Sequence, residues 1–306
     1  MHMEILKTID LSKTYRKTKA LDKVNLTIHQ GDIYGFIGKN GAGKTTLIRV
    51  IAGIAEPTKG SFVLFDESTP MGIVRARKKM AAVVESPALH LNLSAYENLK
   101  LQCILLGIQA DHQTVIQNVL KKVDLERLLV ERKKKAKNFS LGMRQRLGIA
   151  MALISNPKFL VLDEPNNGLD PEGIRDLRQL LLKLNQEEGL TMLISSHMLT
   201  ELSKLATRYG FIDHGKLLRE ISAEQLQRES RQATVLTLAA STLNVETLVK
   251  QGLNDFELNG TQLKIYGQQP IQPYLNALLK QNLELVHMNK ESDDLEAFFM
   301  KMIGGK

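Results

Sequence analysis

A glycine-rich stretch near residue 40 has residue types and spacing suited to binding phosphate. Residues 38–45 read GKNGAGKT and match the pattern G-x-x-x-x-G-K-[ST] without a gap. Glycines let the backbone curl so that several N–H groups point at one anion, and the start of a helix adds partial positive charge. Lys44 can then reach the β- and γ-phosphates, and the Thr45 hydroxyl can bind Mg²⁺. The predicted nucleotide contacts are Gly38, Asn40, Gly41, Gly43, Lys44, Thr45 and Thr46.

The segments on either side of this stretch fit the same interpretation. Residues 32–37 form an apolar run of strand length, and residues 46–52 carry apolar side chains at helical spacing. A strand that passes through a glycine-rich loop into a helix is the context that the motif requires. A chance glycine-rich turn is the alternative, and the complete motif with correct flanks argues against it. The stretch is therefore predicted to bind a nucleoside triphosphate.

Carboxylates and a histidine follow two later apolar runs. Asp163 and Glu164 come directly after the buried-type strand 159–162, where Asp163 can hold Mg²⁺ through water and Glu164 can polarise an attacking water. His197 follows the apolar run 190–195 and can donate to the γ-phosphate or steady that water. A lone acidic pair or histidine at a strand end is more often structural. The phosphate loop upstream shifts the interpretation towards catalysis.

The elements that must position these residues form an α/β pattern typical of a P-loop NTPase. Strands at 4–10 and 20–29 predict a small antiparallel sheet before the loop. Residues 87–155 read as a helical insertion, with a capping box at Ser94 opening a helix to about residue 106, a second helix at 111–123 and a third at 141–154. Elsewhere in the first 219 residues, strand-like and helix-like segments alternate. They predict strands at 61–65, 80–84, 159–162, 190–195 and 209–213, and helices at 46–52, 72–79, 171–187 and 198–206.

A change of character near residue 220 predicts two domains, 1–219 and 220–306. Strands are predicted at 233–239, 254–259, 262–266 and 283–288, with helices at 242–251, 270–281 and 292–303. The order β-α-β-β-α-β matches a small α+β, ferredoxin-like unit followed by one terminal helix. This C-terminal domain can be a regulatory or dimer-stabilising module, or a packing appendage without a ligand of its own.

Composition narrows the class of protein. The net charge of +8 is uneven, since residues 220–306 hold 8 Lys+Arg against 11 Asp+Glu, a net −3, and residues 1–219 therefore carry +11. Basic clusters at 75–79 and 131–137 are usually solvated faces, with a membrane surface or nucleic acid as a weaker interpretation. The lone Cys103 excludes an internal disulfide and a multi-cysteine metal site. Without a signal-peptide core or a bilayer-length apolar run, the chain is expected in the cytoplasm.

Taken in order over about residues 1–220, the motifs resemble those of the ATP-binding subunits of ABC transporters. Residues 139–146 (FSLGMRQR) stand where that family carries its signature motif, residues 168–171 (GLDP) stand at its D-loop, and Tyr15 stands where an aromatic ring stacks on adenine. The resemblance implies two ATP molecules between two copies of the chain. Each phosphate loop would face Ser140 and Gly142 of the other copy, Asp170 would join the two sites, and a transmembrane permease would be the further partner.

Two departures from the family pattern are informative. In the signature motif, Leu141 replaces the first glycine and Met143 replaces the glutamine. Glu85 stands where the family has a glutamine, in the loop after the strand at 80–84. A carboxylate can still bind Mg²⁺, so the predicted metal ligands are Thr45, Glu85 and Asp163. Glu85 would also raise the negative charge at the metal.

Nearly the whole chain is similar to the subfamily that confers bacitracin resistance and lantibiotic self-immunity. The similarity is carried by residues 84–89, 92–99, 139–146, 295–299 and 303–305. It implies export of a peptide antibiotic and a peripheral position on the cytoplasmic face of the membrane. A lipid or drug as cargo is an alternative. A soluble ABC protein acting on the ribosome or nucleic acid is less well supported, because the chain has one phosphate loop and no sustained heptads, and no nucleic acid partner is expected.

Overall fold

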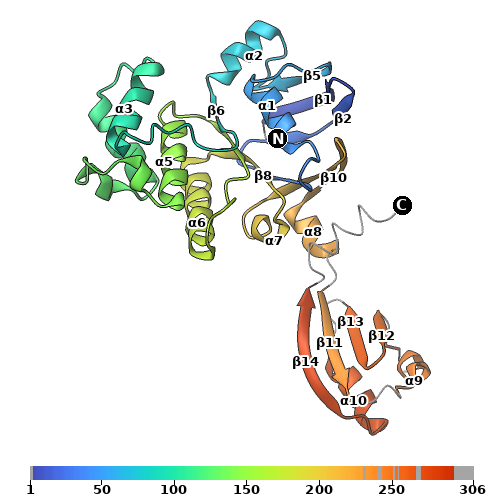
Figure 1. Ribbon diagram of the computed structural model, residues 1–306. Helices are drawn as coiled ribbons and strands as arrows, with labels where there is room; N and C mark the ends of the chain where they lie inside the picture. Colours follow the sequence, from blue (N-terminus) through green and yellow to red (C-terminus); the bar gives the residue numbers. More distant parts are fainter. Residues whose placement is uncertain are drawn as a thin grey trace. The chain divides into compact units, whose positions relative to one another are not determined.

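The computed structural model describes residues 3–229, 232–239, 243–250, 252–253, 255–266 and 270–292 (Figure 1). The chain divides into two compact units, residues 1–223 and 224–306, and each is described by itself. The boundary expected at 219/220 falls inside a strand of the first unit. No helix within the described ranges combines the length and apolar character needed to cross a bilayer.

A six-stranded sheet forms the centre of the first unit. Its strand order is β10 (Lys216–Ser222), β9 (Arg208–Asp213), β4 (Ile33–Ile37), β8 (Thr191–Ser196), β7 (Phe159–Asp163) and β6 (Met80–Val83). All neighbours are parallel except β10, which runs antiparallel to β9. Every residue of β4, β7 and β8 is buried, which explains the continuous apolar runs in the sequence. The carboxyl ends of these three strands meet at one edge, where the phosphate loop, Asp163 and His197 follow them.

Helices join the parallel strands as the alternation predicts. They are α1 (Lys44–Ala52), α2 (Pro70–Arg77), α6 (Pro171–Glu188) and α7 (Leu199–Leu202). Helix α6 begins cleanly because Asp170 accepts a hydrogen bond from the Gly173 N–H at 2.9 Å and Pro171 fills its first position. The helix predicted over 198–206 was too long, since α7 ends at Leu202 and the chain continues through turns into β9.

A second, antiparallel sheet precedes the phosphate loop. It contains β1 (Glu4–Tyr15), β2 (Thr18–Val24), β3 (Thr27–His29) and β5 (Lys59–Leu64), with β1 pairing to all three others. The single strand predicted over 20–29 is wrong, because it is two strands. Lys23 adopts a left-handed backbone with φ 52°, and the Asn25 side chain bonds to Asp10 of β1 and to the Lys23 carbonyl. These contacts turn the chain between β2 and β3.

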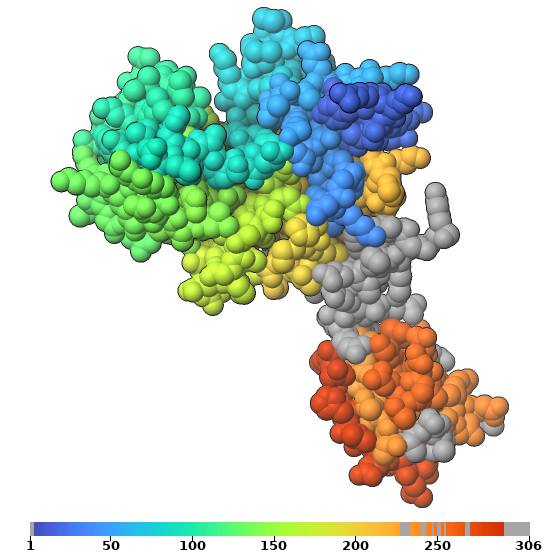
Figure 2. All heavy atoms as spheres, in the orientation of Figure 1, coloured from blue at the N-terminus to red at the C-terminus, as the bar shows by residue number. Residues whose placement is uncertain are grey.

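The helical insertion lies between β6 and β7 and forms the teal-to-green lobe of Figure 2. Its elements are α3 (Ala95–Leu105), α4 (His112–Lys122), the short 3₁₀ helices η1 (Glu126–Leu129) and η2 (Ala136–Asn138), and α5 (Leu141–Leu153). The predicted capping box is present, since Ser94 Oγ accepts from the Glu97 N–H at 3.3 Å and the Glu97 carboxylate accepts from the Ser94 N–H at 2.7 Å. Ser140 caps α5 with a single hydrogen bond, which its Oγ accepts from the Met143 N–H at 3.2 Å.

Strand β10 was not predicted, and it explains where the first unit ends. Glu220 of β10 accepts hydrogen bonds from the Tyr34 hydroxyl at 2.7 Å and from the Thr27 N–H at 3.2 Å. Burial raises the pKa of Tyr34 well above its usual range, so the phenol stays protonated and continues to donate. These contacts attach residue 220 to the central sheet. The division of the chain therefore follows β10, at the start of α8 (Ala223–Glu229).

The second unit has the β-α-β-β-α-β order expected from the sequence. Its antiparallel sheet has the order β12 (Phe256–Asn259), β13 (Gln262–Tyr266), β11 (Gln232–Leu238) and β14 (Leu285–Ser292), with helices α9 (Val245–Lys250) and α10 (Gln272–Lys280). Gly260, with φ 61°, turns the chain between β12 and β13. Strand β14 continues to Ser292, and the rest of the helix expected over 292–303 lies outside the described residues.

Candidate active site

The phosphate loop connects the end of β4 to the start of α1, as predicted. Gly41 and Gly43 have φ values of 83° and 113°, in the region that favours glycine. A Cβ on Gly43 would lie 2.5 Å from the Ala20 carbonyl oxygen, and a Cβ on Gly38 would lie 2.5 Å from the Ile212 carbonyl oxygen. The tight curl of the loop against its neighbours therefore depends on these glycines.

The start of α1 offers backbone donors to an anion. Gly43 stands at the cap position without a side-chain cap, and the first N–H groups of any helix lack an intrahelical acceptor. Thr45 and Thr46 lie half-buried in this first turn, while Asn40 and Gly41 are exposed at the tip of the loop. The helix dipole adds positive potential at the same point. This arrangement suits a polyphosphate.

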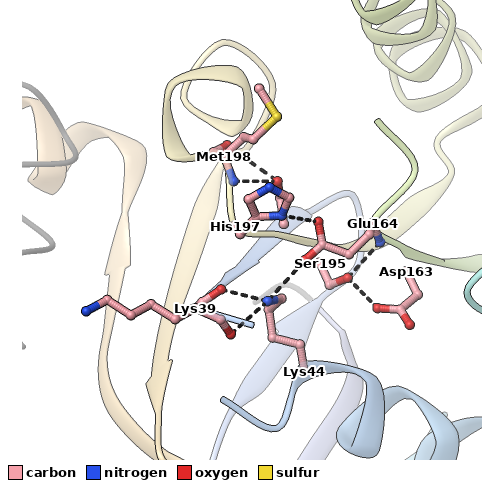
Figure 3. A network of polar contacts seen from close by, with 9 residues as sticks. Lys39, Lys44, Asp163, Glu164, Ser195, His197 and Met198 are labelled. Atoms are coloured by element: carbon pink, nitrogen blue, oxygen red, sulfur yellow. Dashed lines mark hydrogen bonds and ion pairs between the residues drawn. The ribbon is translucent and has the colours of Figure 1, made fainter. Parts of the chain in front are cut away.

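Lys44 holds its ammonium group inside the loop. The side chain is 5% exposed, and Nζ donates to the carbonyl oxygens of Gly38 at 2.6 Å and Lys39 at 3.2 Å (Figure 3). The same Nζ lies 3.1 Å from Glu164 Oε1. The charge of Lys44 is therefore shared between the phosphate loop and the first carboxylate beyond β7.

Glu164 stands between two positively polarised groups. His197 Nδ1 is 2.8 Å from Glu164 Oε2, and this nitrogen donates when it carries the proton. The contact of Oε1 with Lys44 is an ion pair rather than a hydrogen bond, so this buried oxygen has no hydrogen-bond donor within the described chain. Buried carboxylate oxygens normally find a donor. The two carboxylate oxygens of Glu164 therefore face different groups, Oε1 the Lys44 ammonium and Oε2 the His197 ring.

Ser195 is a site residue to which the sequence analysis gave no role. Its hydroxyl donates to Asp163 Oδ1 at 2.6 Å and accepts from the Glu164 N–H at 2.8 Å, and its side chain is fully buried (Figure 3). Asp163 itself is 3% exposed. Glu164 has a left-handed backbone with φ 48°, which the Ser195 contact supports. One hydroxyl therefore fixes the Asp163 carboxylate and the backbone from which the Glu164 side chain extends.

We expect Ser195→Ala to lower the turnover number for ATP by roughly tenfold with little change in KM, because the lost hydrogen bond to a charged group has a net value of about 1.5–3 kcal/mol. Steady-state ATPase assays measure both constants. Ser196→Ala is the matched control, because the buried Ser196 hydroxyl accepts from the Met198 N–H at 2.9 Å and contacts neither carboxylate. Equal turnover in the two variants would contradict the role given to Ser195.

Thr45 and Asp163 supply the hydroxyl and carboxylate oxygens that Mg²⁺ prefers, and a magnesium ion in such sites takes its other ligands from phosphates and water. Glu85, the third predicted ligand, forms an ion pair with Arg49 of α1, and its side chain is 62% exposed. Thr45 lies in the first turn of α1 and Asp163 at the end of β7, beside the phosphate loop.

The signature and D-loop residues gather in a separate place. Ser140, Gly142 and Asp170 line one cavity of about 590 Å³, between the starts of α5 and α6. The lining includes none of residues 38–46. Within one chain, these residues and the phosphate loop therefore lie in two separate places. Tyr15, at the end of β1, is 42% exposed, and Lys13 Nζ lies 5.0 Å from its ring centre.

Comparison with known proteins identifies a matching family model and several relatives. A family model described as "ABC transporter" matches residues 21–167. The chain is 39% identical to the bacitracin transport ATP-binding protein BcrA of Bacillus licheniformis over 304 residues, which is 98% of each chain. It is 42% identical over 216 residues to the lantibiotic transport ATP-binding protein SrtF of Streptococcus pyogenes, covering 71% of this chain and 90% of that protein.

Solved structures share the fold of the first unit. The cbiO1 protein of Clostridium perfringens, part of the ABC transporter complex cbiONQ, superposes with a TM-score of 0.66 at 27% identity, over 74% of this chain and 91% of that chain. The dimeric post-hydrolysis state of the ATP-binding cassette MJ0796, bound to ADP and Pi, gives a TM-score of 0.64 at 28% identity, over 72% and 99%.

Proposed function

Because this chain belongs to the ATP-binding subunits of ABC transporters, we propose that it drives a separately encoded membrane permease that expels a peptide antibiotic. As a member of this family it binds ATP with Mg²⁺ and hydrolyses it. The observation that best supports a hydrolytic site is the Glu164 carboxylate beside the phosphate loop, which contacts Lys44 through Oε1 and His197 through Oε2.

In this proposal each residue of the cluster has one task. Lys44 and the first turn of α1 hold the phosphates, and Glu164 accepts a proton from, or orients, the attacking water. His197 fixes the Glu164 carboxylate and senses the γ-phosphate. Mg²⁺, when bound by Thr45 and Asp163 with the nucleotide phosphates, would neutralise charge that develops on the transferred phosphoryl group. Ser195 keeps Asp163 and Glu164 in place through its two hydrogen bonds.

The complete site is proposed to need two copies of the chain. The cavity with Ser140 and Gly142 presents the start of α5, where backbone N–H groups and the helix dipole favour an anion. That cavity is lined by no phosphate-loop residue, so its anion would come from the nucleotide of a second copy. The dimeric solved relative bound to ADP and Pi supports this arrangement. Asp170, also in the cavity, would lie between the two nucleotides.

A groove beside the edge strand β6 is proposed to receive the permease. It has a volume of about 390 Å³ and lies between β6 and the helical insertion, with Ile54 and Leu106 exposed along it. The loop that follows β6 carries Glu85, which is paired with Arg49 of the phosphate-loop helix. A partner seated here would touch the segment that joins the groove to the nucleotide site. The chain would then sit peripherally on the cytoplasmic face of the membrane.

The cargo is inferred from the relatives named for bacitracin and lantibiotic transport. We expect a susceptible host that expresses the chain with its neighbouring permease gene to tolerate several-fold more bacitracin or lantibiotic, measured as minimal inhibitory concentration. Co-expression of Glu164→Gln with the same permease is the control and should give no protection. Protection against a lipid-like or small-molecule toxin alone would support the other cargo, and co-sedimentation with ribosomes would support the soluble ABC class.

A further inference from the structure

The cavity between the starts of α5 and α6 is lined by one arginine, Arg127, that forms no ion pair with a described residue. Most of the charged residues lining it are paired: Asp124 with Lys183 at 3.4 Å, Arg146 with Asp176 at 2.8 Å, and Glu172 with Arg175 at 3.8 Å. Asp170 caps α6 through the Gly173 N–H. Arg127 lines the same cavity and makes no ion pair with any described residue. Its exposed guanidinium is therefore free of any carboxylate of the described chain and can meet an anion that enters the cavity.

The position of Arg127 links it to the signature segment. Arg127 lies in η1, on the exposed side of that turn, and its Nη2 is 3.7 Å from Met143 Sδ in the first turn of α5. A thioether sulfur is a weak acceptor, whereas a guanidinium carries five donors. The contact therefore holds the arginine over the start of α5 while most of its hydrogen-bonding capacity stays unused. Ser140, which caps α5, lines the same cavity.

We propose that Arg127 binds the nucleotide held by the phosphate loop of a second copy of this chain. The inference rests on the two-copy site proposed above. A guanidinium is always charged, and its planar fork matches phosphate oxygens, so it adds positive charge on the side of the nucleotide opposite Lys44. The Met143 side chain has no hydrogen-bond donor, and the Arg127 guanidinium that lies against it supplies donors at this point of α5.

A dimerisation assay tests the contact. In a Glu164→Gln background, chosen to slow hydrolysis, the ATP concentration needed for half-maximal dimer formation is measured by light scattering with Mg²⁺ present. We expect Arg127→Ala to raise that concentration on the order of tenfold or more, and Arg127→Lys to raise it less, because charged hydrogen bonds are lost in full or in part. Binding of a fluorescent ATP analogue to the dilute single chain should not change.

The matched control is Arg132→Ala. Arg132 lies just beyond η1, in the basic cluster 131–137, but its guanidinium lies 4.7 Å from the ring centre of Tyr96 and does not line the cavity. Its removal should leave ATP-driven dimerisation unchanged. Equal dimerisation of the Arg127→Ala and parent proteins would overturn the inference alone. Failure of the Glu164→Gln parent to dimerise with ATP would overturn the two-copy site, and the inference with it.

Mixed dimers decide whether Arg127 acts across the interface. Lys44→Ala disables one phosphate loop, and hydrolysis at the other is measured. When Arg127→Ala is on the other copy from Lys44→Ala, the intact loop faces an intact Arg127, and activity should persist. When both changes are on one copy, the intact loop faces the altered cavity, and activity should fall on the order of tenfold. The reverse pattern, or no difference, would overturn the inference.

Discussion

Replacing Glu164 by glutamine is expected to reduce ATP hydrolysis by about 100-fold or more, the range for loss of a general base, and to leave ATP binding intact. Glutamine keeps the size and shape of the side chain, so the contact with His197, 2.8 Å from Oε2, can persist in a neutral form. It removes the negative charge and the proton acceptor next to the phosphate loop. Steady-state phosphate release and equilibrium binding of ATP measure the two effects separately.

Glu85→Gln provides the control for this substitution. It is the same chemical change on an exposed carboxylate that pairs with Arg49, and it restores the residue that the family carries. We expect this variant to hydrolyse ATP at a rate close to that of the parent chain. Full turnover in Glu164→Gln would show that another group activates the water, and it would remove Glu164 from the catalytic role.

Lys44→Ala is expected to weaken ATP binding at least tenfold and to lower hydrolysis on the order of 100-fold, because a preorganised cation facing the phosphates is lost. The side chain is buried, and its ammonium group bridges the carbonyl of Gly38 to the carboxylate of Glu164. Alanine therefore removes the proposed phosphate contact and the cation paired with Glu164. Titration calorimetry and phosphate release report the two losses.

Lys39→Ala is the matched control for charge in the same loop. Lys39 contributes only its backbone carbonyl to the network, and Figure 3 shows its side chain directed away from the cluster. Alanine keeps that carbonyl, so nucleotide binding and hydrolysis should stay close to the values of the parent chain. Equal losses in the two variants would mean that general positive charge, rather than the placement of Lys44, accounts for binding.

Local patterns were sufficient for most of the nucleotide-binding core. The phosphate loop is contiguous in sequence, so its position between β4 and α1 follows from residues 32–52 alone. Strands β7 and β8 were predictable because complete burial requires continuous apolar runs. The α5 start was predictable because Ser140 immediately precedes the helix that it caps. In each case the determinant lies within a few residues of the element.

The features that the sequence did not reveal depend on pairing between distant segments. Ser195 meets Asp163 because β7 and β8 are neighbours in register, and no local pattern states which residues lie opposite each other. Strand β10 is held by Glu220 bonding to Tyr34, which is 186 residues away in the sequence. Glu85, in the loop after β6, pairs with Arg49 of α1, which is distant in the sequence. Such contacts are properties of the folded chain.

A second copy of the chain is proposed to complete the ATP site. The molar mass and the nucleotide content of Glu164→Gln, isolated in the presence of ATP and Mg²⁺, test this directly. We expect a species of twice the 34.3 kDa chain mass that holds two ATP molecules. A species of single-chain mass that holds one ATP, at protein and nucleotide concentrations that saturate binding, would contradict it.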